Sequence, residues 1–295
     1  MKVLCWMKTS RKIIKNKKEE SDVNKLHPQL FEYEFDKDMR AFSTTRNGGV
    51  SKGAYTSFNI NHYCGDDEKA IRQNRQILCN ELHITDNCLV MPHQVHGINI
   101  LKVDQEFMQL SNEKRKEALE GVDGLITSLR GVCIGISTAD CIPVLIYNKD
   151  RHIAAAVHAG WRGTVKRIVT TALEAVQTNY SIRPEELSAI IGPGISLDSF
   201  EVGNEVFEQF KSAGFPMPLI AEKYPAKAPY TEKWHIDLWE ANRLQLLEGG
   251  MLRENIRVAG VCTYRHADEF FSARRLGIKS GRIFTGILFP DQINE

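Results

Sequence analysis

A strand–strand–helix pattern in the middle of the chain constrains this fold more than any other feature. Three apolar runs, at residues 132–136, 142–147 and 153–157, have the length and composition of buried strands. The Asn-Lys-Asp-Arg segment at 148–151 separates the second run from the third and is typical of a turn. Apolar residues then recur at helical spacing over 165–176. The segment therefore predicts an antiparallel hairpin followed by a helix.

Two side chains that can bind a metal lie at the ends of this predicted hairpin. Cys141 comes directly before its first strand, and His158 comes directly after its second. An antiparallel pair brings those two ends together in space. The sequence therefore predicts that a thiol and an imidazole are neighbours, although they are 17 residues apart.

The remaining elements alternate irregularly along the chain. Helices are expected over 67–82, 106–120, 203–213 and 237–248. Strands are expected within 30–44 and at 88–91, 98–103, 188–191, 257–264 and 283–289, the last of which closes the sheet. This order favours an α+β (mixed α/β) class over a regular βαβ series. Because no repeat or low-complexity linker divides it, we expect residues 29–295 to form a single catalytic domain.

The charge of the chain is concentrated at its N-terminus. Residues 1–18 hold seven Lys and Arg and no acid, so the rest carries a net charge of −6. A mildly acidic body is not typical of a nucleic-acid-binding protein. No apolar region of a secretory signal follows the basic residues. We expect residues 1–28 to be a basic, disordered extension that can be removed without loss of folding or activity.

The cysteine content and the apolar runs indicate a cytoplasmic protein. The seven cysteines are an odd number at low density, which does not suggest a disulfide framework and fits a reducing compartment. The longest uncharged stretch, residues 87–101, is 15 residues long and contains Asn, Gln and His. It is too short and too polar to span a membrane. We therefore expect neither a membrane nor nucleic acid among the partners.

Several common catalytic signatures are absent from the chain. There is no phosphate-binding P-loop, no Gly-x-Gly-x-x-Gly, no His-Glu-x-x-His and no Gly-x-Ser-x-Gly. The Pro-Cys-x-x-Cys half of the zinc deaminase signature is missing as well. These absences argue against the commonest nucleotide-binding, metalloprotease and α/β-hydrolase sites.

A set of histidines and cysteines remains as the candidate for chemistry, namely His93, His96, Cys141, His158 and Cys262. Two imidazoles and one thiolate form a typical catalytic zinc set with an open fourth position. Zinc lowers the pKa of a bound water to about 7, which supplies a nucleophile at neutral pH. The spacing alone leaves two alternatives open. Cys141 could be an ordinary core residue, and His158 could serve only as a hydrogen-bond partner at the start of a helix.

Three sequence blocks resemble the signatures of a known family. They are Gln-Val-His-Gly at 94–97, Thr-Ala-Asp-Cys-Ile-Pro-Val at 138–144 and His-Ala-Gly-Trp-Arg-Gly at 158–163. Further blocks at 43–51, 192–195, 200–203, 262–264 and 271–275 agree in order. Together they resemble the YfiH/YlmD-type family, long labelled laccase-domain or polyphenol oxidase and now associated with purine nucleoside phosphorylase. The loop at 59–62, Asn-Ile-Asn-His, departs from the family pattern.

The resemblance implies both a cofactor and an activity. It implies zinc held by His96, Cys141 and His158. It also implies phosphorolysis of the purine nucleosides adenosine, inosine, guanosine and methylthioadenosine, with adenosine deaminase activity at the same site. Purine nucleosides and phosphate are then the expected partners, whereas the oligomeric state is not indicated.

Phosphorolysis also requires side chains that bind phosphate and move protons. Arg46, in a loop flanked by glycines, and Arg162, at a predicted helix start, are the candidates for binding phosphate, since a guanidinium offers paired donors. A surface ion pair is the alternative for each arginine. Asp140, next to Cys141, is a candidate proton carrier or a carboxylate that orients a ligand histidine. It could equally cap the break between two strands. We count Asp140, Cys141 and Arg162 as candidate catalytic residues.

Three other functions remain open at this stage. Copper could occupy the same ligands, because copper(II) binds such ligands more tightly than zinc, and would suggest a phenol oxidase. Cys141 could instead be the nucleophile of a cysteine hydrolase, with His158 as its base. The chain could also be a binding protein without catalytic activity.

Overall fold

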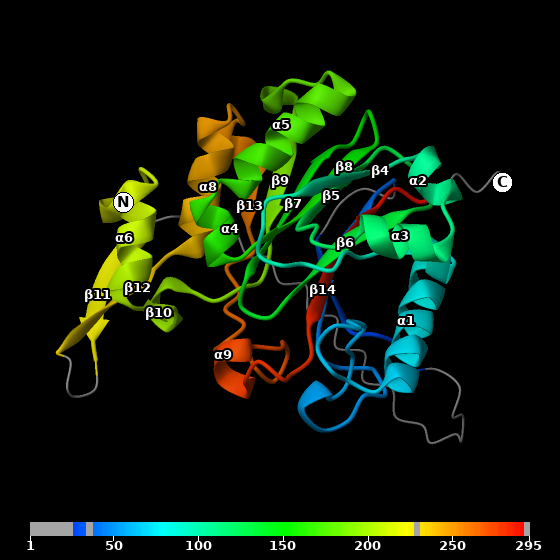
Figure 1. Cartoon of the computed structure of the whole chain (residues 1–295), viewed down its shortest axis with the longest axis horizontal. Coiled ribbons are helices and arrows are strands. Elements are labelled where there is room, and N and C mark those ends of the chain that lie inside the picture. The colour runs from blue at the N-terminus through cyan, green and yellow to red at the C-terminus, as the bar shows by residue number, and fades with distance from the viewer. Residues whose placement is uncertain (1–25, 34–37, 227–230, 292–295) are drawn as a thin grey trace.

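The strands of the protein form three sheets that mix parallel and antiparallel pairs. The computed structural model describes residues 26–33, 38–226 and 231–291. Among the described strands, one sheet has six strands, one has five and one has three (Figure 1). Three of the strand pairs are parallel, and the others are antiparallel. The parallel pairs are β4 (Ile100–Val103) with β5 (Gly124–Thr127), β3 (Leu89–Val90) with β6 (Cys133–Thr138), and β9 (Ser188–Ile191) with β13 (Ile256–Val258). The expected α+β class with mixed sheets is confirmed.

The six-stranded sheet contains the predicted hairpin at its centre. Its strands, in spatial order, are β13 (Ile256–Val258), β9 (Ser188–Ile191), β7 (Ile142–Asn148), β8 (Ile153–Ala159), β5 (Gly124–Thr127) and β4 (Ile100–Val103). Strands β7 and β8 are antiparallel, as predicted, with Ile142 opposite Ala159 and Asn148 opposite Ile153. Every residue of β8 is buried, and its alternate alanines face the two cores on either side of the sheet.

The other two sheets are assembled from segments that are distant in sequence. The five-stranded sheet has the order β1 (Leu30–Tyr33), β2 (Arg40–Thr44), β14 (Ile283–Leu288), β6 (Cys133–Thr138) and β3 (Leu89–Val90). The three-stranded sheet has the order β10 (Glu201–Val202), β12 (Glu232–Ile236) and β11 (Ala221–Pro225). The prediction that 283–289 closes the sheet is wrong, because β14 lies between β2 and β6.

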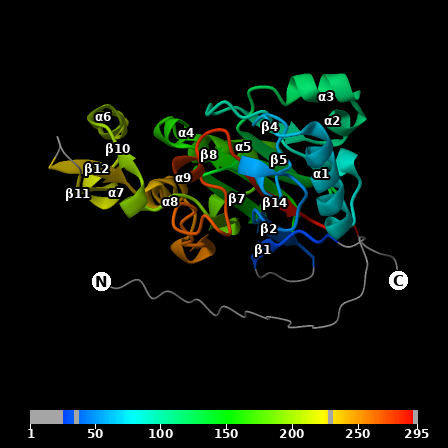
Figure 2. The same cartoon turned by 90° about the horizontal axis from the view of Figure 1, so that it is seen from below.

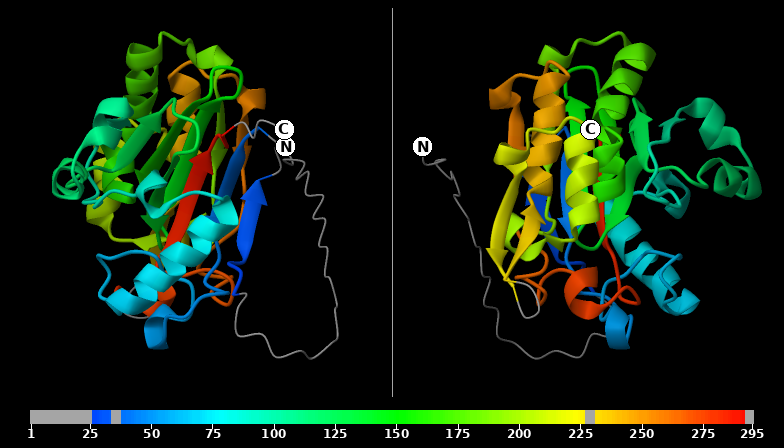
Figure 3. Two further views of the ribbon diagram at one scale, coloured as in Figure 1. Left: turned by 90° about the vertical axis from the view of Figure 1, so that its right-hand side faces the viewer. Right: turned by 60° about the vertical axis from the view of Figure 1, so that its left-hand side comes forward.

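The two larger sheets pack face to face and are covered by helices on their outer sides. Ile134 and Ile287 of the five-stranded sheet share a core with Leu145 of the six-stranded sheet. Helices α5 (Ile168–Tyr180) and α8 (Leu238–Glu248) cover the other face of the six-stranded sheet, and α1 (Glu68–Leu82) covers the five-stranded sheet (Figures 1 and 3). The β7–β8 hairpin is therefore buried on both faces, which holds its ends rigidly.

The remaining helices are short and lie around these layers. They are α2 (Gln105–Gln109), α3 (Asn112–Ala118), α4 (Trp161–Val165), α6 (Asn204–Ser212), α7 (Met217–Ile220) and α9 (Ala273–Leu276). Helices α6 and α7 accompany the three-stranded sheet at one end of the molecule, while α2 and α3 lie at the other (Figure 2). Among the described residues, no helix combines the length and the apolar character needed to cross a membrane.

Three predicted elements differ from the structure in their bounds. The helix expected to continue through 165–176 is broken between α4 and α5, because Arg167 has a φ of 64°. Its guanidinium is fixed there by the Glu248 carboxylate and the Ala213 carbonyl. The expected helix 106–120 is divided into α2 and α3 by the N-cap Ser111. The strand expected at 257–264 ends at Val258, so Cys262 lies in a loop.

Most of the expected N-terminal extension, residues 1–25, lies outside the described residues. The few described residues before β1 contact the body of the protein. Pro28 is buried, and the His27 carbonyl lies where a side chain on Gly48 would be. Residue 48 must therefore be glycine for two reasons, because its φ is 90° and because the His27 carbonyl leaves no room for a Cβ. The division into a tail and one catalytic domain over 29–295 stays a prediction.

Candidate metal centre

Three side chains that can bind a metal converge at one end of the β7–β8 hairpin. The ligand atoms of His96, Cys141 and His158 all lie within 4.8 Å of one another. The Cys141 Sγ is 3.8 Å from the His96 Nε2, and the two imidazole rings meet edge to face with centroids 4.8 Å apart. His158 is buried, Cys141 is half-buried and His96 is exposed. The group therefore has one side open to solvent.

The fold brings these residues together from two separate segments. His158 lies on β8 opposite Pro143, and Cys141 immediately precedes β7, so the hairpin register makes them neighbours as predicted. His96 comes from the loop between β3 and β4 and has a φ of 60°. A non-glycine residue in this conformation needs support from its surroundings.

Asp123 supplies that support, and the sequence did not single it out. Its buried carboxylate accepts the backbone N–H groups of Val95, His96 and Gly97, at 3.2, 2.9 and 2.7 Å. The same carboxylate accepts a 2.7 Å hydrogen bond from the Nδ1 of His158. This bond fixes the ring tautomer and leaves Nε2 as the nitrogen available to a metal. One carboxylate therefore positions both histidines.

Gly160 leaves the space that the three side chains occupy. A Cβ at this residue would lie 2.7 Å from the His96 Cδ2 and 3.1 Å from the Cys141 Sγ. The φ of Gly160 is −68°, a value that any residue adopts. Glycine is therefore required here for space and not for its backbone conformation.

The charges of the group are strongly coupled. Burial opposes ionisation of the Cys141 thiol, but the adjacent His158 and His96 outweigh it and lower the pKa of the thiol to about 6. Burial likewise disfavours the His158 cation, but the Cys141 thiolate and the Asp123 carboxylate raise the pKa of this imidazole to about 9. Both shifts act in the same direction, because each favours the charged form of the group, a Cys141 thiolate beside a His158 imidazolium. A metal would take the place of the proton on His158.

The donor set fits a tetrahedral transition metal. Zinc–sulfur bonds of about 2.3 Å and zinc–nitrogen bonds of about 2.0–2.1 Å place tetrahedral ligand atoms roughly 3.4–3.6 Å apart. The 3.8 Å separation of the Cys141 Sγ and the His96 Nε2 is close to this value. Among the described residues, the group could hold a metal through two nitrogens and one sulfur.

Asp140 lies beside the group but contacts another part of the fold. It has a φ of 87° and is 8% exposed. Its carboxylate accepts the Thr263 hydroxyl at 2.7 Å and the backbone N–H of Arg274, in α9, at 2.6 Å. The structure thus places Asp140 as a capping carboxylate, and the orientation of His158 is performed by Asp123. A proton-carrying role for Asp140 stays a prediction.

The two arginines predicted to bind phosphate have different surroundings. Arg46 donates to the carbonyls of Thr56 and Ala267 and lies 5.1 Å from the ring centre of Phe271. Two of its nitrogens are thereby engaged by the backbone. Arg162 is exposed in the first turn of α4, with its guanidinium 4.3 Å from the ring centre of Trp161. Their roles in binding phosphate stay predictions.

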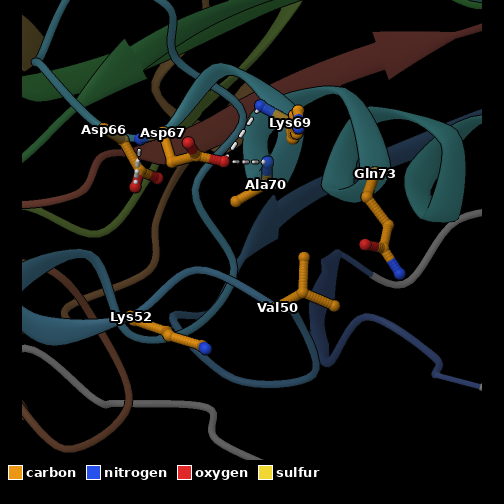
Figure 4. Close-up of a pocket in the computed structure, with 7 residues that line it drawn as sticks. All are labelled: Val50, Lys52, Asp66, Asp67, Lys69, Ala70 and Gln73. Carbon is orange, nitrogen blue, oxygen red and sulfur yellow. Dashed lines mark hydrogen bonds between the residues drawn. The ribbon is translucent and has the colours of Figure 1, made fainter.

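The other members of the predicted His/Cys set lie outside the metal group. His93 pairs with Glu120 at 2.6 Å and stacks on Tyr63. Cys262 is buried and accepts a hydrogen bond from the Ser196 hydroxyl at 2.9 Å. A separate pocket of about 510 Å³ lies at the start of α1, lined by Val50, Lys52, Asp66, Asp67, Lys69, Ala70 and Gln73 (Figure 4). None of these lining residues belongs to the metal group.

Comparison with known proteins identifies the family to which this geometry belongs. Residues 40–290 match the family described as multi-copper polyphenol oxidoreductase laccase. A purine nucleoside phosphorylase from Bacteroides thetaiotaomicron is 49% identical over 247 residues, which are 84% of this chain and 90% of that protein. The chain therefore belongs to the family that this model describes. Another member, the adenosine deaminase RL5 from an unknown prokaryotic organism, is 42% identical over 84% of this chain and 93% of its own length.

Solved structures of the same family confirm the fold. YlmD from Geobacillus stearothermophilus has a TM-score of 0.77 and 32% identity, covering 86% of this chain and 93% of its own. The hypothetical protein YfiH from Bacillus licheniformis has a TM-score of 0.79 and 26% identity, covering 91% and 98%. The resemblance to the YfiH/YlmD-type family drawn from the sequence blocks is confirmed.

Proposed function

We propose that this chain is a zinc-dependent purine nucleoside phosphorylase that also deaminates adenosine. The observation that carries the proposal is the His96–Cys141–His158 group, preorganised by Asp123 and open on one side, in a chain that shares 49% identity with a purine nucleoside phosphorylase. We propose adenosine, inosine, guanosine and methylthioadenosine as its substrates, with phosphate as the second reactant.

The phosphorolysis exchanges one bond for another at the sugar. The bond between C1′ of the ribose and N9 of the purine breaks, and its electron pair leaves with the base, which takes up a proton. A phosphate oxygen forms the new bond to C1′, which gives ribose 1-phosphate. Arg46 and Arg162 are the residues we propose to hold the phosphate, because guanidinium groups bind phosphate through paired donors. Asp140 is the carboxylate that we propose to carry a proton.

The metal group of this chain would act mainly through position and charge. A bound zinc ion supplies a Lewis acid and an activated water. Cys141 and His158 would hold it from the rigid hairpin, and Asp123 would keep the His158 Nε2 directed toward it. His96, exposed at the entrance, would border the side from which substrate arrives.

Adenosine deamination is the second activity that a specific observation favours. The 42% identical relative is named an adenosine deaminase. In this reaction water adds its oxygen to C6 of the purine, and the amino group leaves as ammonia. A metal-activated water is the nucleophile used for such deaminations. The reaction needs no phosphate, which separates it from phosphorolysis in an assay.

A phenol oxidase that uses several coppers is less well supported. Three of the other histidines pair with Glu68, Glu120 and Arg130. Among the described residues, only the single three-ligand group was found that could hold a metal. We therefore propose zinc as the metal, with copper at the same ligands as the alternative.

Chromatography of the reaction products tests the proposed function. Purified protein is incubated with inosine, with and without phosphate, and with adenosine in the absence of phosphate. We expect hypoxanthine and ribose 1-phosphate to form from inosine only when phosphate is present, and inosine and ammonia to form from adenosine without it. Oxidation of a phenol by the copper-loaded protein, with no release of base, would contradict the proposal.

A further inference from the structure

An exposed aromatic pair includes a residue of the segment that carries the ligand His96. The rings of Tyr63 and His93 are stacked, with centroids 3.9 Å apart and planes inclined by 19°. Tyr63 is 41% exposed although it is a large, partly apolar residue. The Nδ1 of His93 also pairs with the Glu120 carboxylate at 2.6 Å. The pair is therefore both rigid and accessible to solvent.

The segments that carry this pair are the same ones that position the metal ligands. His93 precedes the ligand His96 by three residues, so their Cα atoms are at most about 11 Å apart. The backbone of His93 bonds to Leu119 and Gly121, and that of His96 bonds to Asp123. Two adjacent strips of chain, residues 93–96 and 119–123, thus hold His93 beside Glu120 and His96 beside Asp123.

A second connection reaches the segment that carries Cys141. Asn61 donates to the Ser137 hydroxyl at 2.8 Å and accepts the backbone N–H of Tyr63 at 2.6 Å. Gln94 pairs with the backbone of Ser137 through both ends of its amide, at 2.7 and 2.8 Å. The loop that departs from the family sequence pattern, residues 59–62, therefore anchors Tyr63 between the two ligand-bearing segments.

We propose that Tyr63, supported by His93 and Glu120, is the surface on which the purine base of the substrate stacks. The inference rests on the proposed function, since it takes a purine nucleoside as the ligand. The base is planar and aromatic, so it matches an exposed ring that is already held in place.

The exposure of Tyr63 leaves this residue able to contact a ligand. It is 41% exposed, so the protein does not enclose it. Stacking on an aromatic side chain tolerates different bases, because every base has a flat face. The surface would therefore accept adenine, hypoxanthine and guanine alike, in agreement with a broad range of purine substrates.

Equilibrium binding of inosine without phosphate tests the inference separately from turnover. The protein is prepared with its metal as purified, and the dissociation constant is measured for wild type, Tyr63→Ala and Tyr63→Phe. We expect Tyr63→Ala to bind inosine about 5- to 150-fold more weakly, the range given by base–aromatic stacking. Tyr63→Phe keeps the ring and should bind as wild type does.

A matched control is provided by Tyr224. It contacts His235 with ring centroids 4.6 Å apart, but this pair lies on the separate three-stranded sheet. Tyr224→Ala should leave inosine binding unchanged, and Tyr63→Ala should leave metal content and the KM for phosphate unchanged. Inosine binding by Tyr63→Ala with the wild-type constant, or an equal loss in Tyr63→Phe, would overturn the inference. Normal nucleoside binding without release of base would instead contradict the proposed function.

Discussion

Replacement of Asp123 by asparagine tests whether one carboxylate preorganises the metal group. Asn has nearly the same shape as Asp but one acceptor oxygen instead of two. The Asp123 carboxylate accepts four hydrogen bonds, one from His158 and three from the backbone of Val95, His96 and Gly97. Each oxygen of the carboxylate accepts two of these bonds. In Asp123→Asn, an NH2 group replaces one oxygen and cannot accept either of its two hydrogen bonds.

The expected size of the effect follows from these bonds. Leaving two donors unpaired costs at most about 2–6 kcal/mol of unfolding free energy, at about 1–3 kcal/mol for each fully buried donor, because the three backbone donors are only partly buried. This loss is within the usual total of about 5–15 kcal/mol, so much of the variant should still fold. Loss of the partner that orients a metal-binding histidine lowers metal affinity about 10- to 100-fold. We therefore expect Asp123→Asn to be less stable and to bind zinc about 10- to 100-fold more weakly.

Competition with a chromophoric zinc chelator measures the affinity, and circular dichroism confirms folding. Asp66→Asn is the matched control, because the Asp66 carboxylate also accepts side-chain hydrogen bonds, from Ser51 and Asn59, and it lies away from the ligand atoms. It should keep the wild-type zinc affinity. A folded Asp123→Asn protein with wild-type zinc affinity would refute the role assigned to this carboxylate.

Three further predictions concern the same group. In metal-free protein, iodoacetamide should alkylate Cys141 increasingly as the pH rises through about 6, because the thiolate forms there. Cys79, whose pKa is raised to about 11, should remain unreactive at neutral pH. Mass spectrometry that found Cys141 to react only above pH 8 would contradict this prediction. Gly160→Ala should fold but lose most of its zinc in elemental analysis, since its Cβ would lie 2.7 Å from the His96 ring, and full zinc occupancy would show that the loop adapts. Asp140→Asn should keep its zinc and be destabilised by about 1–3 kcal/mol in urea unfolding, because its carboxylate binds Thr263 and Arg274; loss of zinc would show that it supports the ligands after all.

The hairpin and the juxtaposition of two of the three candidate metal ligands could be predicted because the signal is local. Apolar strands with a polar turn between them define the β7–β8 register, and the register makes Cys141 and His158 neighbours. The helix break at Arg167 could not be predicted in this way. The apolar stripe continues across it, and the bonds that fix Arg167 come from Glu248 and Ala213, which are far away in sequence.

The role of Asp123 and the position of β14 within its sheet both depend on contacts between segments that are distant in sequence. Asp123 acts on residues 26 to 35 positions away, and local periodicity does not register such contacts. One feature of the sequence could have indicated the role of Asp123. It is an acid between apolar Val122 and Gly124 at the start of a buried strand, and a buried carboxylate requires partners. Strand β14 pairs with β2, more than 230 residues earlier, and with β6, and its own sequence shows only that it is buried.

The proposed function depends most directly on whether Cys141 is a metal ligand in a phosphorolytic enzyme. Zinc content and phosphate-dependent release of hypoxanthine from inosine are measured on the same preparations of wild type and Cys141→Ser, with circular dichroism to confirm folding. We predict about one zinc per chain and full activity in the wild type, and loss of both together in the variant. A folded Cys141→Ser protein that retains its zinc but is inactive would contradict the ligand assignment, and would favour a cysteine hydrolase with Cys141 as its nucleophile.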